Sequence, residues 1–193
     1  MRKIHSRKLW AGTLAAGVTA ALGLTFVTSS APAESEQRGT PTITMVQDGD
    51  QLSFEGPDSI LPGQTLRIVN DTDPEQIGPH TFSLTKQNLI PSNGNEAKAC
   101  FKVEPGTACK KVFRAHDVNL EKEKVGKKVV DDGKAGWNLM FRDQGFTGDS
   151  WFALQENADH ERVVSAEAGK TLSYFCAIHP EMQGSIEVEN PVK

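Results

Sequence analysis

Short runs rich in β-branched and aromatic residues recur along this chain and are separated by turn residues. Apolar and polar side chains alternate in several of them, as in Leu66–Arg67–Ile68. The predicted strands are residues 42–46, 51–54, 64–70, 80–85, 170–176 and 185–189. Few runs have a helical period, so we predict an antiparallel all-β domain, either a sandwich or a Greek-key barrel.

The first 33 residues have the pattern of an export signal. Four cationic side chains lie within residues 2–8, an apolar stretch follows at 9–27, and Ala31-Pro32-Ala33 supplies the small residues of a cleavage site. A twin-arginine pair and a lipoprotein cysteine are both missing from this segment. We therefore expect an exported protein that is periplasmic, cell-surface or extracellular. Since the apolar stretch approaches the ~20 residues that span a bilayer, an uncleaved membrane anchor is the alternative.

The rest of the chain has the size of one domain and a marked negative charge. Removing 33 of 193 residues leaves 160, of which 34–40 form a polar, flexible lead-in and 41–193 the predicted domain. The removed segment holds four basic residues and no acidic one, which leaves 17 basic against 25 acidic residues, a formal charge of −8. Nucleic acid is therefore not an expected partner, whereas a basic protein or a small ligand is compatible.

The middle of the chain, residues 86–162, differs in composition from the strands around it. We predict a large loop insertion with its own hairpins, held by a disulfide between Cys100 and Cys109, because Pro105-Gly106 provides a turn between them. Aromatic residues are expected to pack the insertion on the barrel. They are Trp137, Phe141, Phe146, Trp151 and Phe152.

Pairing of those two cysteines leaves Cys176 as a free thiol, and its neighbours suggest a reason for it. In Cys176-Ala177-Ile178-His179-Pro180-Glu181-Met182, a thiol, an imidazole and a thioether are spaced three residues apart. They are the ligands of an electron-transfer copper site, which requires one more imidazole. His80, in Gly78-Pro79-His80 at the start of a predicted strand, can supply it.

These two segments resemble the copper-binding sequences of the cupredoxins, the blue type 1 copper proteins. The Cys-x2-His-x2-Met spacing is most similar to that of amicyanin, while plastocyanin and pseudoazurin have a longer gap between His and Met. The resemblance implies a cupredoxin-like fold, one type 1 copper per chain held by His80, Cys176, His179 and Met182, and one-electron transfer with an unidentified redox partner protein. The insertion departs from the small members of the family, as does Glu181 at a position that is apolar in amicyanin.

Other interpretations of the same residues remain. Cys176 alone could be a buried core thiol and His80 a satisfied strand-end histidine, and zinc also accepts Cys and two His, although a Met ligand is unusual for it. The alternative function is copper storage, delivery or sequestration without electron transfer, which would favour additional exposed Met or His clusters. No enzymatic activity is expected, because the chain has no His-x-His pair for further copper centres. His116 and His160 lie beside charged residues and are expected to face solvent.

Overall fold

The structure is a computed structural model that describes residues 39–131, 135–138 and 148–191. The predicted export signal at 1–33 and the aromatic residues Phe141 and Phe146 lie outside the described residues. Within the described ranges, no helix has the length and apolar character needed to cross a membrane.

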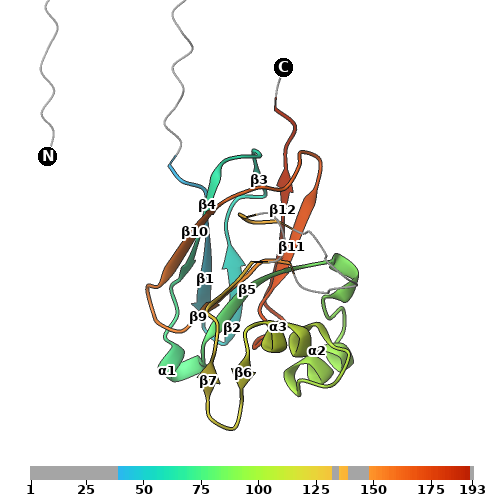
Figure 1. The fold of residues 1–193 in the computed structure, drawn as a ribbon. Helices are drawn as coiled ribbons and strands as arrows, with labels where there is room; N and C mark the ends of the chain where they lie inside the picture. Colours follow the sequence, from blue (N-terminus) through green and yellow to red (C-terminus); the bar gives the residue numbers. More distant parts are fainter. Residues whose placement is uncertain (1–38, 132–134, 139–147, 192–193) are drawn as a thin grey trace, which may run out of the picture. The chain divides into compact units, whose positions relative to one another are not determined.

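Two β-sheets make up the framework of the domain (Figure 1). The smaller sheet has the strand order β10-β4-β1-β2 and the larger has the order β3-β12-β11-β5-β9-β8. The strands of the smaller sheet are β1 (Thr42–Asp48), β2 (Gln51–Glu55), β4 (Thr65–Asn70) and β10 (Asp159–Val163). Those of the larger sheet are β3 (Ser59–Ile60), β5 (His80–Thr85), β8 (Val129–Val130), β9 (Ser150–Ala153), β11 (Thr171–Phe175) and β12 (Gln183–Val188). Most pairs are antiparallel, and the exceptions among the described residues are β1 with β4 and β12 with β3.

The main core lies between the two sheets and follows from the alternation in the sequence. In β4, Leu66 and Ile68 are fully buried, whereas the intervening Arg67 is partly exposed. They pack in one cluster with Phe82 of β5 and Tyr174 of β11. The predicted fold class, an all-β sandwich with a large disulfide-stapled insertion, is thereby confirmed.

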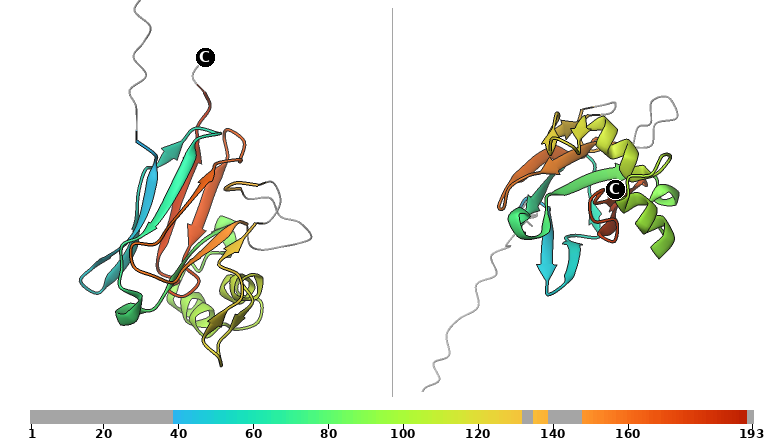
Figure 2. Two further views of the ribbon diagram at one scale, coloured as in Figure 1. Left: turned by 60° about the vertical axis from the view of Figure 1, so that its left-hand side comes forward. Right: turned by 90° about the horizontal axis from the view of Figure 1, so that it is seen from below.

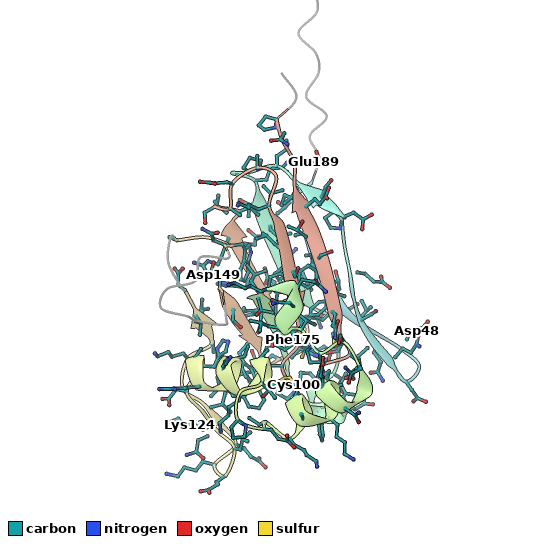
Figure 3. All side chains as sticks on the ribbon, turned by 90° about the vertical axis from the view of Figure 1, so that its right-hand side faces the viewer. Asp48, Cys100, Lys124, Asp149, Phe175 and Glu189 are labelled. Carbon is teal, nitrogen blue, oxygen red and sulfur yellow. A yellow bond between two sulfur atoms is a disulfide. The ribbon has the colours of Figure 1, made fainter. Side chains whose placement is uncertain are left out.

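β5 is buried on both of its faces, because a second layer covers the side of the sheet that faces away from the main core. The layer contains α2 (Gly94–Phe101) and α3 (Ala108–Ala115), joined by the Cys100–Cys109 disulfide. Figure 3 shows Cys100 and Phe175 close to these helices, and both residues belong to the second apolar cluster. The predicted disulfide is confirmed, but two helices stand where loops and hairpins were expected.

Residues 86–162 therefore form part of both sheets as well as the covering layer. Besides the helices, they supply a short hairpin of β6 (Val118–Asn119) and β7 (Lys124–Val125), and they also supply β8, β9 and β10. β9 pairs with β5 and β10 pairs with β4, so the segment expected as an insertion contributes strands to both sheets. Trp137 and Trp151 lie in the main core and Phe152 in the second cluster, as expected for residues that fix this segment.

Two helices and a short hairpin lie at one end of the sandwich. α1 (Pro74–Ile77), α3 and the β6–β7 hairpin lie at the end opposite the C-terminus (Figures 1 and 2). β5 begins at this end and β11 finishes there. The segments around His80 and Cys176 therefore meet at the same end of the larger sheet.

Candidate metal centre

The loop between β11 and β12 has a fixed, compact conformation. The Cys176 amide donates to the Met182 carbonyl oxygen at 3.0 Å, and the Met182 amide donates to the His179 carbonyl oxygen at 2.9 Å. These two backbone bonds close the loop at its base and tighten the turn within it. The side chains of Cys176, His179 and Met182 are thus presented from one rigid segment.

His80 reaches the same place from the other side of the β5–β11 pair. It follows Gly78, which ends α1 with φ +84°, and Pro79, and it is the first residue of β5. Its Nδ1 lies 3.1 Å from the Nδ1 of His179, and both Nδ1 atoms lie 3.7 Å from the Cys176 Sγ. The sequence separates His80 from Cys176 by 96 positions, and the fold brings them together.

The three donor atoms form one cluster that is shielded from solvent. All lie within 4.8 Å of one another, and among the described residues they are the one group of His, Cys, Asp and Glu side chains found at metal-binding separations. His80 and Cys176 are fully buried and His179 is partly exposed. Met182 is also fully buried and packs in the same core cluster as Cys176. The structure therefore assembles all four of the side chains singled out from the sequence.

Backbone amides point at the sulfur of Cys176. The Thr81 amide donates to Sγ at 3.3 Å and the His179 amide does so at 3.4 Å. Burial raises the pKa of the Cys176 thiol, while these hydrogen bonds and one from the Thr81 side chain lower it. A buried thiolate requires a nearby positive charge in addition to hydrogen bonds, and a metal cation meets that requirement.

Both histidines are held in the neutral form that binds metals. Burial and the nearby His179 lower the pKa of His80 to about 4, and burial lowers the pKa of His179. His179 Nε2 lies 3.0 Å from the carbonyl oxygen of Ile77, which can only accept, so this nitrogen carries the proton. The Nδ1 lone pair of His179 is therefore free and faces the cluster, as a ligand must.

The donor set fits copper better than zinc. Two imidazoles, one thiolate and a thioether match the His₂Cys site with a weak axial Met that electron-transfer copper uses, whereas structural zinc uses four strong N or S ligands. The surroundings are dry: Phe82 and Phe175 are fully buried, and the half-buried Ile178 packs against both apolar clusters.

Two expectations about other histidines were wrong. His116 has no exposed surface, and His160 is partly buried and stacked on Trp151 with a ring centroid distance of 5.9 Å. Sequence reasoning also missed Thr81, whose amide donates to the Cys176 sulfur and whose hydroxyl accepts a 2.8 Å bond from the Ala177 amide. Its place directly after His80, at the start of a predicted strand, is the signal that could have pointed to it.

No protein-family model matches the chain, and no curated protein matches its sequence. Among solved structures, it is similar to auracyanin A, a "blue" copper protein of Chloroflexus aurantiacus, at 21% identity and a TM-score of 0.39, covering 77% of this chain and 98% of that one. It is also similar to dithionite-reduced auracyanin of Roseiflexus castenholzii, at 17% identity and a TM-score of 0.40, covering 79% of this chain and 98% of that one.

A third similar structure is a multi-copper oxidase of Pediococcus acidilactici, at 12% identity and a TM-score of 0.35. The similarity covers 84% of this chain and 28% of the oxidase. The likeness of the ligand loop to that of amicyanin stays a prediction from its spacing.

Proposed function

We propose that this chain is an exported blue-copper protein that binds one type 1 copper and transfers single electrons between redox partners. The observation that carries the proposal is the convergence of His80 Nδ1, His179 Nδ1 and Cys176 Sγ, at 3.1–3.7 Å from one another, beside the buried Met182. Copper in such a ligand set supplies one-electron chemistry between its Cu(I) and Cu(II) states.

The residues around the cluster support a site that changes little between two oxidation states. The backbone bonds within the loop 176–182 fix three of the ligands, and the Ile77 carbonyl fixes the ring of His179. The apolar cluster that contains Cys176, Met182 and Phe82 keeps water away from the sulfur. A rigid, dry ligand set limits the reorganisation that accompanies each electron transfer.

Electrons are proposed to enter and leave through the edge of His179. Of the four proposed ligands, His80, Cys176 and Met182 are buried, and His179 keeps partial exposure. Its Nε2 is nevertheless covered by the Ile77 carbonyl of α1, so the partner protein would meet α1 and the ligand loop together. The partner itself is proposed only as a redox protein.

Copper storage or delivery is the weaker candidate. Such proteins release the ion readily, which exposed Met and His side chains assist. Among the residues that the structure describes, the methionines are Met45 and Met182, and both are fully buried.

A ligand set supplied entirely by the protein also leaves no open position for a substrate, which supports electron transfer rather than catalysis.

Export is supported by two features. The first 33 residues carry the charge and apolar pattern of a signal segment. The Cys100–Cys109 disulfide is of a kind that persists in oxidising compartments.

The test is the visible absorption spectrum of the purified protein after addition of Cu(II), beside three variants. We expect an intense thiolate-to-copper band in the wild type that bleaches on reduction, is absent from Cys176→Ser, and is lost or altered in His80→Gln. His160→Gln is the matched control, because His160 lies outside the cluster, and it should retain the band. A colourless wild type that binds zinc or Cu(I) instead would overturn the proposal.

A further inference from the structure

Four polar side chains are buried between the larger sheet and the layer of helices that covers it. Thr81 and Ser83 lie on the face of β5 opposite to Phe82, since alternate residues of a strand point to opposite faces. Ser150 lies on the neighbouring strand β9, and His116 directly follows α3. All four residues have no exposed surface.

These side chains form one continuous hydrogen-bonded chain. His116 Nε2 lies 2.7 Å from Ser150 Oγ, and Ser150 Oγ lies 2.7 Å from Ser83 Oγ. Thr81 Oγ1 then lies 2.9 Å from Ser83 Oγ. We call this chain of His116, Ser150, Ser83 and Thr81 the buried relay.

The buried relay ends at the ligand loop. Thr81 Oγ1 accepts the Ala177 amide at 2.8 Å, and the Thr81 amide donates to the Cys176 sulfur at 3.3 Å. The Thr81 hydroxyl is thus held between Ser83 Oγ on one side and the Ala177 amide on the other. Its rotamer is therefore set by the hydroxyls behind it.

The far end of the relay is anchored by the segment that packs on the sheet. His116 Nδ1 lies 2.6 Å from the Lys127 carbonyl oxygen, which can only accept, so Nδ1 carries a proton. The ring also packs edge-on against Phe152, with centroids 5.3 Å apart. His116 is thus held on three sides, and its Nε2 has a fixed direction.

Packing alone does not account for this arrangement. Four buried polar groups are costly unless each is paired, and apolar side chains of similar size would fill the same layer without that cost. The paired groups lead from the covering layer to the Ala177 amide of the ligand loop.

We propose that His116 is a positioning residue for the copper centre, which acts through Ser150 and Ser83 to hold Thr81, whose hydroxyl accepts the Ala177 amide and whose own amide donates to the Cys176 sulfur. This inference rests on the proposed function. It gives the helical layer a role at the redox site, because hydrogen bonds to a ligand sulfur help to set the reduction potential.

The experiment uses Ser150→Ala, which removes one hydroxyl from the middle of the relay and leaves every proposed ligand in place. Two properties are measured in the full protein: hydrogen exchange of the Ala177 amide without metal, and the reduction potential with copper bound. We expect the Ala177 amide to exchange about fivefold faster, since a net hydrogen bond is weakened. The reduction potential should fall, because a sulfur that loses a donor binds Cu(II) more strongly.

Two further variants test the relay as a unit. Ser83→Ala should shift the potential in the same direction, and the double variant Ser83→Ala/Ser150→Ala should shift it by no more than the larger single effect. His116→Phe keeps the ring packing on Phe152 but removes both nitrogens, and it should lower the potential as well.

The control is Ile43→Val, a fully buried residue of β1 in the opposite sheet. It lowers stability to a similar extent without touching the relay, and it should leave both the exchange and the potential unchanged. Relay variants that keep the wild-type potential would overturn the inference, whatever their stability. A wild type that gives no blue band would instead overturn the proposed function, and the Ala177 exchange would still decide whether the relay positions the loop.

Discussion

His179 donates a 3.0 Å hydrogen bond from Nε2 to the carbonyl oxygen of Ile77, the last residue of α1. This bond fixes the tautomer of the imidazole and the direction of its Nδ1 lone pair. Asp73 caps α1 through the Glu75 amide at 2.9 Å, and Gly78 ends it. A four-residue helix with defined ends therefore orients one proposed ligand and leads directly into the strand that carries another.

The first prediction concerns the effect of the Gly78 conformation on stability and on copper retention. With φ +84° and ψ 169°, it occupies a region that is essentially restricted to glycine, so Gly78→Ala should destabilise the protein by about 1–3 kcal/mol. The strain would also displace Ile77 and loosen His179, so copper should dissociate faster. Chemical denaturation and chelator-induced loss of the visible band measure the two effects.

Gly94→Ala is the control for that measurement. Gly94 is the first residue of α2, and a Cβ there would meet no atom within 4 Å. This variant should retain wild-type stability and copper retention. Equal behaviour of the two alanine variants would contradict the role given to α1.

The second prediction concerns the reduction potential after substitution of Met182, the weak ligand of the proposed set. Met182→Leu keeps the volume of a fully buried side chain and removes the thioether. The blue band should persist, since the thiolate and both imidazoles remain, and the reduction potential should rise, since a donor to Cu(II) is lost. Spectroelectrochemistry measures both, and a potential below that of the wild type would contradict an axial role for Met182.

The sequence predicted six strands of the two sheets, and the four converging side chains, for a common reason. Strand alternation and the Cys-x2-His-x2-Met spacing are local patterns, and they need no knowledge of distant contacts. β10 has no such pattern: in Asp159–Val163 the only large aliphatic side chain is an exposed valine, and the strand exists because it pairs with β4. Its non-local origin explains why it was missed.

α3 and His116 show two different limits. The N-cap Thr107 and the buried Cys109, Val112 and Phe113 at helical spacing were a usable helix signal that was overlooked. His116, by contrast, lies between Arg114 and Asp117, and no local pattern indicates that Ser150, 34 residues away, covers its Nε2. Charged neighbours in the sequence do not report which side of a residue faces the core.

The third prediction concerns the stability that the disulfide contributes. The Cys100–Cys109 bridge closes a loop with a sequence separation of 9, for which the chain-entropy model gives a stabilisation of about 2.5 kcal/mol. The double variant Cys100→Ser/Cys109→Ser should lose about this amount in denaturant unfolding. It should keep the blue band, because both cysteines lie outside the ligand cluster. Loss of colour without loss of stability would contradict the separation of the two sites.

The last prediction concerns the contribution of His116 to the pH dependence of stability. Burial lowers its pKa below the ordinary value of 6.5, and the hydrogen bond to the Lys127 carbonyl offsets this only in part. As pH falls below about 6.5, the unfolded chain therefore takes up a proton at this position before the folded chain does, and stability is lost. Above that pH the histidine is neutral in both states and contributes no slope. We expect metal-free His116→Gln to lose less stability than the metal-free wild type between about pH 7.5 and about pH 5. Because the other histidines titrate in both proteins, the difference between their urea unfolding free energies isolates His116, and equal losses would contradict its burial as a neutral ring.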